Sequence, residues 1–130
     1  MSKWSQYNLE AKITQILSSV PDSSDVHHLG RAYLTAYQIA IEFARRFPND
    51  FSAIKLPIGG AGTGQRNSLS QYFAQQLSRR INSKEIQHIE GGFLSNLHLN
   101  EISFESEDSL LVSSLTDSGF TLSMYRLRSQ

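Results

Sequence analysis

Residues 68–92 read SLSQYFAQQLSRRINSKEIQHIEGG, and within them the spacing of apolar side chains changes from helical to strand-like. As far as Asn82, apolar residues recur at every fourth position, which is the spacing of one helix face. These residues are Leu69, Phe73, Leu77 and Ile81. Beyond Asn82, Glu85–His88 predict a short strand and Gly91-Gly92 predict a turn or bulge. Helices precede this change and strands follow it, so the sequence predicts an α+β fold.

Two further helices are predicted on the N-terminal side of this stretch. Trp4–Leu17 carries an apolar stripe at helical spacing. Tyr33–Phe47 carries another, and Thr35 and Gln38 have the spacing of a capping box near its start. The sequence Pro48-Asn49-Asp50 is expected to stop this second helix.

Strands are predicted on the C-terminal side. Ile102–Glu105 alternates like an edge strand, while Leu110–Leu115 and Phe120–Leu127 flank a polar turn and predict a hairpin. In the second arm of the hairpin, Phe120, Leu122 and Met124 alternate with Thr121, Ser123 and Tyr125. Three N-terminal helices are therefore expected to precede a small antiparallel sheet or hairpin, and a winged-helix-like domain is one familiar form of that order.

The length and composition limit the class of protein. A length of 130 residues fits one domain, residues 1–130, with a helical part at about 3–82 and a β-rich part at about 85–128. The absence of cysteine excludes disulfides, thiolate zinc sites and thiol catalysis. The N-terminus lacks the apolar run of a signal peptide, and the hydrophobic stretches are too short for a bilayer. A cytoplasmic protein with no membrane partner is the simplest expectation.

The charges are unevenly distributed along a chain whose formal net charge is zero. Residues 51–84 contain five Lys or Arg residues and no Asp or Glu, whereas residues 85–130 contain two basic and seven acidic residues. The basic stretch suggests a surface for an anionic partner. The alternative is that the two oppositely charged regions satisfy each other within the fold or between subunits.

The basic stretch includes a glycine-rich loop, Gly59–Gly64, just before the third helix. It is not a nucleotide-hydrolysis motif, because Gln65 and Arg66 stand where a P-loop requires Lys and Ser or Thr. Backbone N–H groups of Gly62–Gly64, together with Arg66, suit an anion instead. The competing interpretation is a connector in which glycine supplies positive φ angles.

The third helix starts at Ser68, with Gln71 at capping-box spacing, and Asn67 is an alternative cap. Opposite its apolar face, Gln71 and Gln75 lie one turn apart and are followed by Arg79. Amides and guanidinium groups suit base edges, and lysine suits phosphate. The predicted nucleic-acid or anion site comprises Gly62, Thr63, Gly64, Arg66, Asn67, Gln71, Gln75, Arg79, Arg80 and Lys84.

Several observations keep other interpretations open. An ordinary solvated helix face would look similar, the sequence pI of about 6.9 is low for a dedicated nucleic-acid binder, and Glu101–Asp108 is acidic. Arg45 and Arg46 would add only non-specific attraction. The alternatives are a protein-interaction or self-associating module with complementary charged patches, and a site for a small phosphorylated ligand at the glycine loop. A homodimer formed edge to edge, for example through Glu101–Glu105, belongs to the first of these.

The sequence offers no recognisable catalytic motif. Its histidines are His27, His28, His88 and His98, and none falls in a His-x-x-x-His or His-Glu-x-x-His pattern. No serine lies in Gly-x-Ser-x-Gly. The expectation is therefore a non-enzymatic DNA-binding protein without a metal or cofactor, with the alternatives given above.

Overall fold

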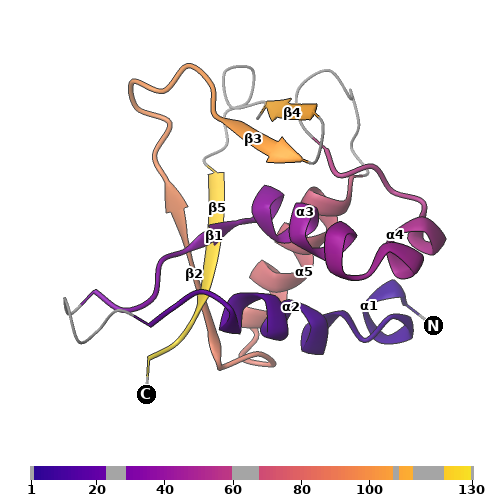
Figure 1. Ribbon diagram of the computed structural model, residues 1–130. Helices are drawn as coiled ribbons and strands as arrows, with labels where there is room; N and C mark the ends of the chain where they lie inside the picture. The colour runs from indigo at the N-terminus through magenta and orange to yellow at the C-terminus, as the bar shows by residue number, and fades with distance from the viewer. Residues whose placement is uncertain (1, 23–28, 60–67, 107–108, 113–121, 130) are drawn as a thin grey trace.

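The computed structural model describes residues 2–22, 29–59, 68–106, 109–112 and 122–129, and they form an α+β fold (Figure 1). The helices are α1 (Lys3–Gln6), α2 (Leu9–Ser18), α3 (Ala36–Arg46), α4 (Pro48–Ile54) and α5 (Leu69–Asn82). The strands are β1 (Leu34–Thr35), β2 (Ile89–Leu94), β3 (Ser103–Ser106), β4 (Ser109–Val112) and β5 (Leu122–Leu127). The predicted fold class is therefore confirmed. In the described part of the chain, no helix is both long and apolar enough to cross a bilayer.

The first predicted helix is in fact two helices. The chain breaks at Asn8, which adopts a left-handed conformation with φ 52° and ψ 49°. Asparagine tolerates this region better than most residues because its short side chain bonds locally. The ammonium of Lys12 then donates to the Tyr7 carbonyl at 2.7 Å and forms an ion pair with Asp50. The break therefore turns α1 across the end of α2, and it leaves Trp4 buried.

Pro48 begins a helix rather than only ending one. The second predicted helix does end at Arg46, but α4 follows after one residue, with Pro48 in its first turn. Proline is tolerated there because the first N–H groups of a helix have no partner within it. The expectation that Pro48-Asn49-Asp50 stops the preceding helix is thus met, but the helix that these residues begin was not predicted. At the other end of α3, Thr35 caps the helix in the reciprocal capping box with Gln38, as predicted.

The core lies between the helices and one face of the sheet. The rings of Phe43 on α3 and Phe73 on α5 meet edge to face, with centroids 5.4 Å apart. Both side chains are fully buried, as are Leu9 and Ile13 of α2. Ser68 is the N-cap of α5, since its hydroxyl accepts the Gln71 amide. The apolar stripes predicted for these helices therefore face one common core.

The strands pair differently from the predicted hairpin. β3 pairs with β4 in a separate ribbon, whereas β5 lies between β1 and β2 in an antiparallel sheet of order β1-β5-β2. The residues predicted as the two arms of one hairpin thus belong to different sheets. β1 was wrongly included in the helix predicted at Tyr33–Phe47, because two residues are too few to show an alternating pattern. Its Leu34 lies opposite Tyr125 of β5.

Tyr125 accounts for Gly91, the first of the two glycines that the sequence suggested were a turn or bulge. The strand predicted at Glu85–His88 was wrong, because β2 begins only at Ile89. Gly91 and Gly92 lie inside β2, where Gly91 is opposite Tyr125. The tyrosine is only 2% exposed, and its hydroxyl donates to the Ala74 carbonyl at 3.1 Å and meets the Ser78 hydroxyl at 2.7 Å. A Cβ atom on Gly91 would lie 3.1 Å from the tyrosine ring. A side chain at position 91 would therefore crowd the ring where it passes β2 on its way to α5.

The two neighbouring glycines provide a matched test. We expect Gly91→Ala to lower the free energy of unfolding by about 1–3 kcal/mol, because a buried and hydrogen-bonded ring has to move. We expect Gly92→Ala to change it by less than about 0.5 kcal/mol, since a Cβ atom there meets nothing within 4 Å. Urea unfolding of both variants checks this, and equal effects would contradict the role given to Tyr125.

Candidate functional site

The outward face of α5 carries the predicted polar stripe. Gln75, Arg79 and Asn82 are exposed and Gln71 is half-buried. The Arg79 guanidinium makes no hydrogen bond or ion pair with another residue in the described part of the chain, and the only bond outside the helix ladder is from the Ser83 amide to the Arg79 carbonyl. Lys84 is exposed just beyond the helix, in a left-handed conformation with φ 68°. The structure therefore leaves four of the predicted site residues accessible, three on one face of α5 and the fourth just beyond its end. We call this set the α5 stripe: Gln71, Gln75, Arg79 and Lys84.

Arg80 belongs to a different environment from the α5 stripe. Its guanidinium lies 4.9 Å from the centre of the Trp4 ring and forms an ion pair with Glu85. Its Nε atom donates to the Gln76 side chain at 3.2 Å. These contacts hold the guanidinium against α1, and they compensate its charge. Arg80 is therefore better explained as a residue that fixes α1 to α5 than as part of an anion site.

The first amides of α5 are occupied within the protein. Leu69 donates to the Pro57 carbonyl at 2.7 Å and Ser70 donates to the Ile58 carbonyl at 3.0 Å. The Gln71 amide donates to the Ser68 hydroxyl at 3.2 Å. Because these groups are satisfied, the end of the helix does not offer them to an anion. Any anion contact at this end depends on the loop itself, and the predicted residues Gly62, Thr63, Gly64, Arg66 and Asn67 lie outside the described residues.

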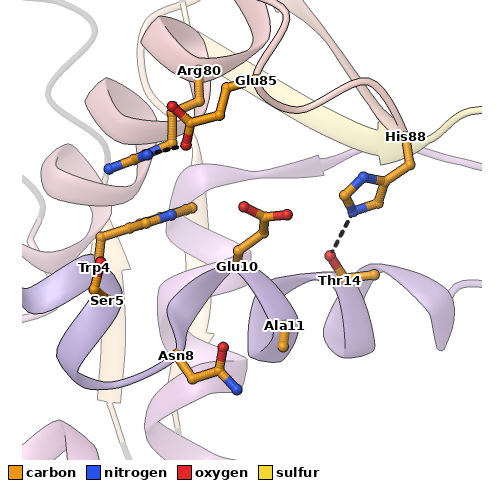
Figure 2. A pocket seen from close by; sticks show the side chains of 9 residues that line it. All are labelled: Trp4, Ser5, Asn8, Glu10, Ala11, Thr14, Arg80, Glu85 and His88. Carbon is orange, nitrogen blue, oxygen red and sulfur yellow. Dashed lines mark hydrogen bonds and ion pairs between the residues drawn. The ribbon is translucent and has the colours of Figure 1, made fainter.

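A pocket of about 650 Å³ opens where α1, α2 and the segment leading into β2 meet (Figure 2). The residues that line it are Trp4, Ser5, Asn8, Glu10, Ala11, Thr14, Arg80, Glu85 and His88. They come from segments about eighty residues apart in the chain, so the sequence spacing gave no sign of the pocket. The burial of Trp4 near the N-terminus is the feature that indicates the pocket, and this burial cannot be predicted from the sequence.

The groups in this pocket favour a cationic or neutral molecule over an anion. Thr14 and His88 hydrogen-bond to each other at 2.9 Å, and Arg80 is already paired with Glu85. The Glu10 carboxylate has no hydrogen bond or ion pair with another described residue, and it is therefore the uncompensated charge of the pocket. Among the described residues, no three His, Asp or Glu side chains gather closely enough to hold a metal ion.

The other paired arginines of the sequence are compensated by Glu42. Arg45 and Arg46 each approach the same carboxylate oxygen at 2.6 Å. The hydrogen bond from Arg45 is the main cause that lowers the pKa of Glu42 from 4.5 to about 2, although desolvation opposes it. The basic surface that the sequence suggested for Arg45 and Arg46 is thus partly neutralised by a residue on the same helix.

The Glu42 cluster has a testable pH dependence. Since the folded-state pKa is lowered, the cluster stabilises the fold fully above about pH 4.5 and loses this effect as the pH falls toward about 2. We expect Glu42→Gln to lower the free energy of unfolding at neutral pH, and the difference from the wild type to shrink over that range. Urea unfolding at a series of pH values measures it, with the exposed Glu101→Gln as control. A difference that stays constant with pH would contradict the assignment.

The geometry thus offers an accessible polar stripe on α5 and a separate, mildly acidic pocket beside α1. The first is formed by residues that the sequence identified, and the second is visible only in the folded chain. No protein-family model, curated protein or solved structure matches this chain. The chemistry of these two surfaces is therefore the basis for a functional proposal.

Proposed function

We propose that this protein is a non-enzymatic DNA-binding domain that contacts DNA through the α5 stripe. The observation that carries the proposal is the combination, on one exposed helix face, of two amides one turn apart with an arginine whose guanidinium has no partner among the described residues. No carboxylate lies on α5. This helix therefore has no carboxylate that would repel the DNA phosphates, as an acidic helix face would.

The residue types of the α5 stripe suit the major groove. A glutamine amide pairs with the two hydrogen-bonding groups of adenine, and an arginine fork pairs with those of guanine. Gln71, Gln75 and Arg79 follow one another at intervals of four residues, so their side chains project from successive turns. Lys84 lies beyond the end of the helix and is suited to a phosphate as a point charge.

The order of the elements supports the same proposal. The sequence α2, β1, α3, α5, β2, β5, with β5 between β1 and β2, resembles the order in a winged-helix domain. In that arrangement α5 corresponds to the helix that enters the groove. The likeness has one clear departure, because α4 and the following residues separate α3 from α5 by far more than a helix-turn-helix turn.

The glycine loop has a secondary part in the proposal. The backbone N–H groups of Gly62, Thr63 and Gly64, with Arg66 and Asn67, are proposed to hold one phosphate beside the start of α5. Arg80, Arg45 and Arg46 contribute little, because Glu85 and Glu42 compensate them. The attraction to DNA therefore depends on a few uncompensated cations, which is consistent with a formal net charge of zero.

One arginine variant and one lysine variant separate this proposal from general electrostatics. We expect Arg79→Ala to weaken duplex binding by about 1–3 kcal/mol, since it removes a base contact. We expect Lys84→Ala to reduce the slope of log affinity against log salt concentration by about one, since it removes a phosphate contact. Arg45→Ala, whose charge Glu42 already compensates, is the matched control and should change both quantities less.

Fluorescence anisotropy with labelled duplex DNA over a range of salt concentrations measures both quantities. Circular dichroism of each variant shows whether the fold is retained. The proposal is wrong if wild-type protein does not bind duplex DNA at low salt, or if Arg79→Ala and Lys84→Ala bind with unchanged affinity and salt slope.

A further inference from the structure

The pocket beside α1 (Figure 2) is a cavity that the proposed contact with DNA does not use. Its volume of about 650 Å³ is in the range of sites for small molecules. Its walls come from α1, α2, the last turn of α5 and the segment before β2, so a molecule inside it would contact four parts of the chain. Arg80 is the only residue of α5 in the lining, and it is not part of the α5 stripe. A ligand in this pocket would therefore be independent of DNA binding.

The lining of the pocket carries one negative charge in excess. With His88 neutral, its charged side chains are Glu10, Arg80 and Glu85. Arg80 and Glu85 form an ion pair, and the guanidinium lies 4.9 Å from the centre of the Trp4 ring. Two opposite charges in contact largely cancel each other for a third group farther away. The Glu10 carboxylate, which forms no ion pair with another residue of the described chain, therefore determines the sign of the charge that the pocket attracts.

A second acceptor lies beside this carboxylate. Glu10 and Thr14 are four residues apart on α2, so they share one face of the helix. Figure 2 shows the Glu10 carboxylate between the Trp4 ring on one side and Thr14 with His88 on the other. The Thr14 hydroxyl meets Nε2 of His88 at 2.9 Å. A hydroxyl oxygen has two lone pairs, so at least one stays available to a further donor in either tautomer of the imidazole.

A primary ammonium group fits this pair of acceptors. It brings one positive charge and several N–H donors, and it has no lone pair that would need a donor from the wall. An anion would instead be repelled by Glu10. A metal ion is a poorer fit, because no three His, Asp or Glu side chains gather closely enough among the described residues. Ala11 and the exposed rim of Trp4 are the apolar parts of the lining, and they suit a short apolar body.

We propose that this pocket binds a small organic monocation, with a primary ammonium group held by Glu10 and Thr14 and a short apolar body against Ala11 and Trp4. The alternative role of Glu10 is to complement the positive end of the α2 dipole, because it lies in the first turn of that helix. That role explains a carboxylate at this position, but it requires neither the pocket nor the hydroxyl beside it. The two roles differ in whether a cation binds.

Calorimetric titration at neutral pH tests the proposal with benzylamine and butylamine, and with benzyl alcohol and butanol as neutral molecules of the same shape. We expect each amine to bind saturably and about tenfold or more tightly than its alcohol, because only the amine brings a charge to Glu10. Glu10→Gln keeps the size of the side chain and should remove this difference. Thr14→Val keeps the shape and should weaken amine binding about threefold. Glu101→Gln removes an exposed carboxylate outside the pocket and should bind as the wild type does.

The fluorescence of Trp4 shows whether the amine lies in this pocket, because the chain has no other tryptophan. We expect its emission to change with the same half-saturation that calorimetry gives. Circular dichroism shows whether Glu10→Gln is folded, and if it is not, Thr14→Val and the comparison of amine with alcohol still decide. The proposal is overturned if neither amine binds saturably, if the alcohols or a folded Glu10→Gln bind as well, or if a bound amine leaves the emission of Trp4 unchanged.

Discussion

The contact between the Tyr125 hydroxyl and α5 is the one on which the arrangement of helices and sheet depends. It joins the central strand β5 to Ala74 and Ser78 in the middle of the helix that carries the proposed site. The ring passes Gly91 on its way to α5, where a Cβ atom would lie only 3.1 Å from it. A buried hydroxyl with its partners fixes one arrangement more strictly than apolar packing alone. The position of the α5 stripe therefore depends on Tyr125, which contacts the helix from the sheet.

Aromatic and charged side chains determine which cations remain available on the surface. Trp4 and Glu85 together hold Arg80, and Glu42 holds the paired arginines of α3. Arg126 is placed similarly over Tyr33, with Glu90 as its carboxylate partner. An arginine that is stacked and paired in this way acts mainly as packing. The count of basic residues in a segment thus overestimates its attraction for a polyanion, and Arg79 and Lys84 are the described exceptions on the α5 stripe.

Local rules predicted the three main helical segments from the sequence, but they missed the break at Asn8, the short helix α4 and the pairing of strands. The cap at Thr35 and the apolar stripe from Leu69 to Ile81 depend on residues within a few turns, so their signals are complete in the local sequence. The partner of β5 depends on contacts with Gly91 and Leu34, which are remote in the chain, and proximity in sequence wrongly favoured β4. For the site, exposure of Gln75 and Arg79 followed from the helical wheel. The contact between Arg80 and Trp4 could not be predicted in this way, because no local sequence pattern relates the two residues.

The place of β5 in the sheet has a consequence for how the chain folds during synthesis. β1 and β2 both pair with β5 and not with each other, so neither has a partner in this sheet until residues 122–127 have been made. Contacts such as Leu34 with Tyr125 span most of the chain, and long-range pairing of this kind is slow. The helices can collapse on their apolar faces earlier, while the strand edges stay open. A nascent chain of this protein is therefore most exposed to wrong partners just before its last strand leaves the ribosome.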